Sequence, residues 1–260
     1  MARLLSAYRA GWRLALLFDY DGTLTPVVGH PDLARLAPAT RRLLRRLARL
    51  PRAAVGVLSG RGLDDLRGKV GLPGLYYAGV CGLELDLRGR RLTHPGAEAC
   101  RPLLRAAADG LKNVAASFPG AWVEDKGLGL TLHYRAVECG RRPELLARAC
   151  RVTAEHAGRL RVVEGPLAWE VTPAVGWDKG SALRQVVAAV GEPVFPVYAG
   201  DGANDAEALA AAAALGGLAL GVGPAAPPCV RLRVPDPAAL AGFLARLAAA
   251  LADPASAPAT

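Results

Sequence analysis

Short apolar runs alternate along the chain with longer segments in which apolar residues recur every three or four positions. The short runs predict strands buried on both faces, and the longer segments predict helices with one apolar face. The predicted strands are Leu14–Phe18, Ala53–Leu58, Tyr76–Ala78, Val194–Ala199, Leu218–Val222 and Val230–Val234. The predicted helices are Pro38–Leu50, Leu63–Lys69, Lys179–Val190, Asn204–Ala214 and Pro237–Leu251. This order predicts an α/β fold, a parallel sheet with helices on both faces.

The middle of the chain breaks this alternation. Its predicted elements are a helix at Ala97–Phe118, an alternating segment at Trp122–Arg135, a helix at Pro143–Ala157, and strands at Leu160–Val163 and Ala168–Val171. The order predicts an α+β domain with an open antiparallel sheet. We therefore expect residues 96–172 to form a domain inserted into a larger one, made of residues 1–95 and 173–260. An insertion placed over a parallel sheet suggests a lid.

Composition and length indicate a globular protein without covalent cross-links. The chain has 260 residues, 52% of them hydrophobic, which is enough to bury a core without disulfides. Its five cysteines are widely spaced and include no CxxC pair, so neither a disulfide framework nor a zinc site is expected. The apolar run Leu14–Phe18 is too short for a signal peptide. The uncharged stretch Ala208–Val230 is interrupted by glycines and prolines, so we expect no membrane span. The cysteine pattern suits a reducing compartment, so we expect a cytoplasmic protein.

The formal net charge of +9 is compatible with an anionic substrate or with nucleic acid. The densest basic run, Arg41–Arg52, places leucines on one face of a helix and arginines on the other. Because no aromatic residues or nucleic-acid motif accompany it, we interpret the run as a solvated helix and expect no nucleic-acid partner. We expect a monomer that acts on a small molecule.

Candidate chemistry begins where the first predicted strand ends. Asp19 and Asp21 follow that strand in the segment Phe18–Pro26, which reads FDYDGTLTP. Side chains at the carboxyl end of a parallel strand face the ligand edge of the sheet, and Gly22 lets the chain bend away. Two carboxylates at one point suit Mg²⁺, and they can divide nucleophilic attack and proton transfer between them. A structural turn is the other interpretation of such a short motif.

This segment resembles the first motif of the haloacid dehalogenase superfamily of phosphohydrolases, whose other motifs follow in order. The group Ser59-Gly60-Arg61 lies where that family has a hydroxyl donor to the phosphoryl oxygens, with Gly60 and Arg61 as further substrate-binding candidates. Lys179 matches a lysine that pairs with the phosphoryl group. Asp201 matches a metal ligand, and Asp205 a residue that acts on the metal directly or through water. Without the resemblance, Ser59-Gly60 would usually be a simple turn, and Lys179 would usually be a solvated lysine.

The resemblance implies a Rossmann-like core and phosphoryl transfer through an aspartyl-phosphate. Asp19 would be the nucleophile, and Asp21 the group that protonates the leaving alkoxide and then activates water. Ser59 and Lys179 would stabilise the phosphoryl oxygens. The implied ligands of Mg²⁺ are Asp19, Asp21, Asp201 and Asp205. An aspartate at position 21 is typical of phosphomonoesterases and mutases in this superfamily, whereas ATP-driven pumps carry threonine there.

The predicted insertion resembles the cap of trehalose-6-phosphate phosphatases. The segments that carry this likeness are Val123–Arg135 and Glu170–Pro173. Residues of that family at the positions of Glu124, Lys126 and Glu170 contact glucose hydroxyls. The resemblance implies Mg²⁺-dependent hydrolysis of trehalose 6-phosphate to trehalose and phosphate, a step of trehalose biosynthesis. Without it, charged residues on such strands would usually be a solvated face.

Two positions depart from the usual pattern of that family. Cys81 stands where the family has histidine, and Gly202 stands where it has a further aspartate near the metal. Two alternatives therefore stay open: a phosphatase of the same superfamily acting on sucrose phosphate or mannosyl-3-phosphoglycerate, and an inactive sugar-phosphate sensor. The presence of Asp19, Lys179 and the other motif residues argues against the sensor.

Overall fold

The structure is a computed structural model that describes residues 1–165, 167–228 and 230–252. The chain forms two compact units. The first combines Met1–Leu92 with the residues from Asp178 onward, and the second is Thr93–Trp177. The insertion expected at residues 96–172 lies inside the second unit.

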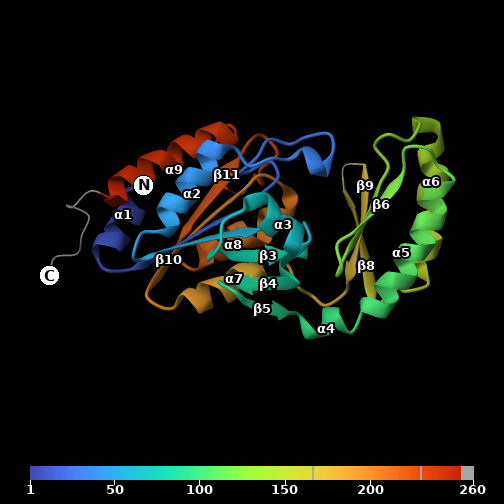
Figure 1. Cartoon of the computed structure of the whole chain (residues 1–260), viewed down its shortest axis with the longest axis horizontal. Helices are drawn as coiled ribbons and strands as arrows, with labels where there is room; N and C mark the ends of the chain where they lie inside the picture. Colours follow the sequence, from blue (N-terminus) through green and yellow to red (C-terminus); the bar gives the residue numbers. More distant parts are fainter. Residues whose placement is uncertain (166, 229, 253–260) are drawn as a thin grey trace. The chain divides into compact units, whose positions relative to one another are not determined.

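The first unit is built on an eight-stranded sheet with the order β12-β11-β10-β1-β2-β3-β4-β5 (Figure 1). The strands are β1 (Arg13–Phe18), β2 (Ala53–Leu58), β3 (Tyr76–Gly79), β4 (Glu84–Leu87), β5 (Arg90–Thr93), β10 (Val194–Gly200), β11 (Leu218–Val222) and β12 (Leu232–Val234). Neighbouring strands from β12 to β3 are parallel, and β4 is antiparallel to β3. The parallel sheet confirms the predicted fold class.

Helices cover both faces of this sheet because alternate residues of each buried strand point to opposite sides. In β1, Leu14, Leu16 and Phe18 pack in one apolar cluster, while Ala15 and Leu17 pack in another. The first cluster includes residues of α1 (Ala2–Arg9), α2 (Pro38–Ala48), α3 (Leu63–Val70) and α9 (Pro237–Ala252). The second includes residues of α7 (Lys179–Val190) and α8 (Ala206–Ala214). In the described residues, no helix is long and apolar enough to cross a membrane.

Strand register decides which loops meet at the sheet edge. Phe18 at the end of β1 pairs with Val57 of β2 and with Ala199 of β10. The three parallel strands therefore end at nearly the same level, and the residues that follow them come together, as is usual for ligand sites of open α/β sheets.

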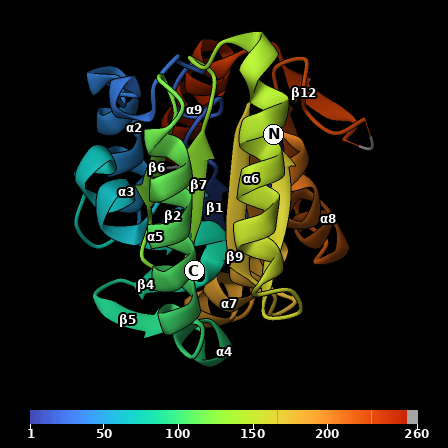
Figure 2. The same cartoon turned by 90° about the vertical axis from the view of Figure 1, so that its right-hand side faces the viewer.

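The second unit has a four-stranded antiparallel sheet with the order β6-β7-β9-β8. Its strands are β6 (Trp122–Asp125), β7 (Leu130–His133), β8 (Leu160–Gly165) and β9 (Ala168–Pro173), and its α-helices are α4 (Pro95–Glu98), α5 (Arg101–Ala116) and α6 (Arg142–Ala154). Figure 2 shows α5 and α6 side by side over one face of this sheet, the face that carries buried Leu130, Leu132 and Val171. Four short 3₁₀ helices complete the described secondary structure of both units: η1 (Pro31–Leu33), η2 (Val80–Gly82), η3 (Cys139–Arg141) and η4 (Ala203–Asp205).

Two predicted elements differ from the structure. The helix expected at Ala97–Phe118 is divided into α4 and α5, because Pro102 has no N–H to donate and is accommodated only in the first turn of α5. The strand expected at Val230–Val234 is shorter, since the N–H of Val230 donates to the carbonyl of Pro227 in a turn and is not available to the sheet.

Candidate active site

The turn after β1 places Asp19 at the sheet edge and reverses the chain at once. The N–H of Asp19 donates to the carbonyl of Ala199 at 2.9 Å, which extends the pairing with β10 by one residue. The backbone N–H and the hydroxyl of Thr25 both donate to the carbonyl of Tyr20, at 3.0 and 3.1 Å, and close the turn. Gly22 has φ +83°, and a Cβ there would overlap the carboxylate of Asp201. The position therefore requires glycine on two grounds, its conformation and its close contact.

A buried lysine links two of the predicted carboxylates. The Nζ atom of Lys179 lies 2.6 Å from Oδ1 of Asp19 and 2.7 Å from Oδ1 of Asp205, and its side chain is fully buried. Burial by itself lowers the pKa of Lys179, but Asp19 and Asp205 outweigh burial and raise that pKa well above its usual range. Lys179 therefore keeps its positive charge, and the fold brings these three predicted residues together.

Asp205 is held by donors on both oxygens. The hydroxyl of Tyr198 donates to Oδ1 at 2.7 Å, and the N–H groups of Asp201 and Gly202 donate to Oδ2 at 3.0 and 3.1 Å. Asp205 therefore orients Lys179 and shapes the loop that carries Asp201. Tyr198 was not among the residues predicted from the sequence, although a tyrosine in a buried strand next to an acidic loop signals a hydroxyl that needs a partner. Burial, followed by the charge of Asp205, raises the pKa of Tyr198 well above its usual range, so the hydroxyl stays a donor.

Three carboxylates meet at distances that suit a metal ion. Asp19, Asp201 and Asp205 each offer an oxygen, and these atoms lie within 4.8 Å of one another. Burial raises the pKa of Asp19, and Lys179 offsets this only in part; burial and the charge of Asp205 raise the pKa of Asp201. The three carboxylates carry more negative charge than the single ammonium group of Lys179 balances, and a divalent cation would compensate the difference. Oxygen ligands suit a hard divalent cation, so these residues fit a metal of the Mg²⁺ type.

The carboxylate of Asp21 does not belong to this group of three. Its two oxygens are held by Arg61, with Nε 2.7 Å from Oδ2 and Nη2 2.7 Å from Oδ1. Arg61 is 6% exposed, although it lies in a loop. Burial lowers the pKa of Arg61, but the hydrogen bonds and charge of Asp21 more than compensate. From the sequence, Arg61 is a substrate-binding candidate, and its pairing with Asp21 was not predicted.

Ser59 is buried at the end of β2, in a loop tied to the loop after β3. Its hydroxyl accepts from the N–H of Arg61 at 3.3 Å, and its carbonyl accepts from the N–H of Cys81 at 2.9 Å. Val80 and Cys81 both have left-handed backbones, with φ of 46° and 55°. A Cβ on Gly60 would lie 3.8 Å from Sγ of Cys81. Cys81, the first departure from the usual family pattern, therefore lies beside the predicted phosphoryl-binding group.

The predicted sugar-binding carboxylates occupy one row of the second unit's sheet. Glu124 pairs with Thr131 on the next strand, and Thr131 pairs with Glu170 on the strand after that, so all three share one face. Oε2 of Glu124 lies 2.9 Å from Nε2 of His133. Lys126 follows β6 in the hairpin turn, where its N–H donates to the carbonyl of Gly129 at 2.8 Å.

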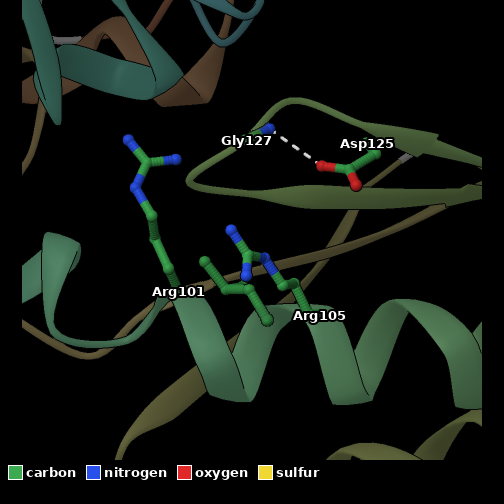
Figure 3. Close-up of a pocket in the computed structure, with 5 residues that line it drawn as sticks. Arg101, Arg105, Asp125 and Gly127 are labelled. Atoms are coloured by element: carbon green, nitrogen blue, oxygen red, sulfur yellow. Dashed lines mark hydrogen bonds between the residues drawn. The ribbon is translucent and has the colours of Figure 1, made fainter.

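A separate pocket of about 170 Å³ lies between the β6–β7 hairpin and α5 (Figure 3). Arg101, Leu104 and Arg105 of α5 line it together with Asp125 and Gly127 of the hairpin. The N–H of Gly127 donates to Oδ1 of Asp125 at 2.9 Å. Strand alternation places Asp125 on the face opposite to its neighbour in β6, so this pocket lies on the helix side of the sheet and none of the predicted sugar-binding residues lines it.

Residues 17–216 match the family model of trehalose-phosphatase. The chain belongs to the trehalose-phosphatase family. A trehalose-phosphate phosphatase from Mycobacterium tuberculosis is 41% identical over 200 residues, which are 75% of this chain and 50% of the relative. This member of the family therefore spans about half the length of the curated relative that it matches. Family membership and the buried carboxylates together indicate a divalent metal site.

Solved structures share the fold of this trehalose-phosphatase family member. The C-terminal domain of trehalose-6-phosphate phosphatase from Candida albicans superposes with a TM-score of 0.79 at 21% identity, covering 95% of this chain and 96% of that one. A haloacid dehalogenase-like hydrolase from Bacteroides thetaiotaomicron superposes with a TM-score of 0.63 at 16% identity, covering 91% and 99%. At these identities the likeness is one of fold, and it confirms the Rossmann-like core of that superfamily.

Proposed function

We propose that this chain hydrolyses trehalose 6-phosphate to trehalose and phosphate with Mg²⁺, as a step of trehalose biosynthesis. The observation that carries the proposal is the buried pair of Lys179 and Asp19 beside Asp201, within the stretch that matches the family. We further propose that the chain acts as a cytoplasmic monomer on a small molecule, without a nucleic-acid or membrane partner.

In the first step, a carboxylate oxygen of Asp19 attacks phosphorus as the bond from phosphorus to the sugar oxygen breaks. Lys179 and the hydroxyl of Ser59 stabilise charge on the phosphoryl oxygens, with Gly60 as a further substrate-binding residue. The electrostatics of such positioned groups supply most of the catalysis in phosphoryl transfer. Water then cleaves the aspartyl-phosphate and regenerates the carboxylate of Asp19.

Asp21 handles the protons in this mechanism. It protonates the sugar alkoxide as that group departs, and it later takes a proton from the water that attacks the aspartyl-phosphate. A sugar alkoxide is a poor leaving group, so its departure depends on that proton.

Asp19, Asp201 and Asp205 are the proposed carboxylate ligands of Mg²⁺. Arg61 holds both carboxylate oxygens of Asp21, so the Asp21 side chain is not included in this set. Hydrogen-bond donors contact both carboxylate oxygens of Asp205. We therefore propose that Asp205 binds the metal through a water molecule, or supports it by orienting the loop that carries Asp201. When bound, the ion supplies positive charge to the phosphoryl oxygens.

We propose that Glu124, Lys126 and Glu170 bind sugar hydroxyls. Sugar hydroxyls both donate and accept, so carboxylates and an ammonium group suit them. Replacing Glu124 by Gln should raise the KM for trehalose 6-phosphate about tenfold while leaving hydrolysis of p-nitrophenyl phosphate nearly unchanged. Equal effects on both substrates would contradict the sugar contact.

The decisive experiment is a substrate panel. Phosphate release by the purified chain with Mg²⁺ is measured for trehalose 6-phosphate, sucrose phosphate, mannosyl-3-phosphoglycerate and glucose 6-phosphate. We expect kcat/KM for trehalose 6-phosphate to exceed the others by about 100-fold. Preference for another sugar phosphate would establish the related phosphatase instead. Binding of trehalose 6-phosphate without turnover of any ester would establish the sensor.

A further inference from the structure

Asp21 is held on both carboxylate oxygens by one side chain. The two bonds from Arg61, both 2.7 Å long, form the parallel fork that a planar guanidinium makes with a carboxylate. The Asp21 side chain is 40% exposed, whereas that of Arg61 is only 7% exposed. An aspartate in an open turn would otherwise sample several rotamers, so this fork determines where its carboxylate lies.

Arg61 is fixed in turn by two other segments and by the residue next to Asp21. Its Nη1 donates to Oδ2 of Asp65 in α3 at 2.9 Å, and its Nη2 donates to the carbonyl of Pro31 in η1 at 2.8 Å. Its guanidinium carbon lies 5.4 Å from the centre of the Tyr20 ring. Arginine has five N–H donors, and the two bonds to Asp21 and these two leave one. Little capacity therefore remains for a phosphoryl group.

We propose that Arg61 is a positioning residue for Asp21, serving proton transfer by fixing the Asp21 carboxylate and not by binding the phosphoryl group itself. The inference rests on the proposed role of Asp21 as general acid and base. Arg61 is also held independently of Asp21, because Asp65 in α3 and the carbonyl of Pro31 in η1 accept from its guanidinium. Lysine offers a single ammonium and no fork, so it should not replace arginine here.

The test compares two esters that differ in their need for a proton. Trehalose 6-phosphate releases an alkoxide, whereas p-nitrophenyl phosphate releases a stable phenolate that leaves without an acid. We expect Arg61→Lys to lower kcat for trehalose 6-phosphate about 10- to 100-fold, the range of general acid–base catalysis, and kcat for p-nitrophenyl phosphate by less than about threefold. The KM of both esters should change little. Asp21→Asn should show the same selectivity with a larger loss.

A double variant tests whether Arg61 acts through Asp21. In the Asp21→Asn background, Arg61→Lys should cause almost no further loss with trehalose 6-phosphate, because the carboxylate that it positions is already gone. Asp65→Asn removes one support of Arg61 and should give a smaller loss of the same selectivity. Asp64→Asn is the matched control, since Asp64 lies next to Asp65 in α3 but pairs with Arg67 and Arg91.

Each outcome has a distinct meaning. A rise in KM, or an equal loss of kcat with both esters, would show that Arg61 binds the phosphoryl group and would overturn the proposal. If Asp21→Asn retained full activity with both esters, the proposed role of Asp21 would fail, and the inference would fail with it. Thermal melting checks the fold of each variant. If Arg61→Lys does not fold, Asp65→Asn decides by the same comparison of the two esters.

Discussion

Single residues in this protein show how a buried charge is tolerated. Lys179 contacts Asp19 and Asp205 with its side chain fully buried, so each charge compensates another where water is excluded. Removing one partner of such a pair typically costs about 3–5 kcal/mol, because the other charge stays buried. The pair is therefore both a candidate catalytic group and a structural constraint.

Asp19→Asn should abolish turnover of trehalose 6-phosphate, with a loss of at least about 1,000-fold, because an amide is a far weaker nucleophile than a carboxylate. Phosphate release under saturating substrate and Mg²⁺ measures this, with Asp64→Asn as an exposed control. Melting of both variants separates lost chemistry from lost fold. Activity retained by folded Asp19→Asn would overturn the nucleophile assignment.

Gly22→Ala should reduce kcat/KM about 100-fold or more, because its Cβ would displace the carboxylate of Asp201 and small displacements at a reacting centre are costly. Gly74→Ala is a matched control. Gly74 also has a left-handed backbone, with φ +76°, but a Cβ there meets nothing within 4 Å. Both variants should lose about 1–2 kcal/mol of stability from backbone strain. Only Gly22→Ala should lose activity, and a parallel loss in Gly74→Ala would contradict the close-contact argument.

At the scale of elements, the pattern of apolar residues predicted β1, β2, β10 and their helices well, since these strands are buried on both faces. It missed β4 and β5, which have four residues each and contain charged side chains. Their two-residue turn, Arg88-Gly89, has left-handed backbones at both positions, as hairpin turns require. Gly89 was the one residue in this segment that indicated a hairpin turn. Pro102 likewise marked the break between α4 and α5.

Tyr77 in β3 makes the stability of the fold depend on pH in the alkaline range. Its hydroxyl donates to the carbonyl of Leu72 at 2.5 Å, and burial raises the pKa of Tyr77 to about 12, above the usual 10. Between pH 10 and 12 the unfolded chain releases this proton and the folded chain keeps it. The stability from this group is therefore complete below pH 10 and is lost as the pH rises through about 12.

Tyr77→Phe should consequently weaken the decline of the unfolding free energy between pH 10 and 12, and it should also cost about 1 kcal/mol at pH 8 from the lost hydrogen bond. Urea unfolding at a series of pH values measures both effects. An unchanged slope in the variant would show that Tyr77 does not contribute to the alkaline loss of stability.

At the scale of the whole molecule, Mg²⁺ should stabilise the fold, because the three carboxylates that could bind it are brought together only in the native state. At 100 times its dissociation constant, a ligand adds about 2.7 kcal/mol, which corresponds to a rise in Tm on the order of 5 °C for a chain of this size. Differential scanning fluorimetry with EDTA and then with Mg²⁺ measures it. Asp201→Asn should remove the rise and Asp64→Asn should keep it; an equal rise in both would place the metal elsewhere.

The sequence by itself predicted the buried parallel strands of the core and the motif residues that follow them along the chain, and it predicted an inserted domain in the middle of the chain. These features depend on local burial and backbone geometry, so they are visible in the spacing of apolar residues and in the glycines of tight turns. Only the tertiary structure decided which side chains meet. Arg61 and Asp21 are 40 positions apart and Lys179 and Asp19 are 160 apart, so each pairing depends on which loops the sheet brings to one edge. A guanidinium fork fits a phosphoryl group as well as a carboxylate, and the residue type alone therefore left the partner of Arg61 undetermined.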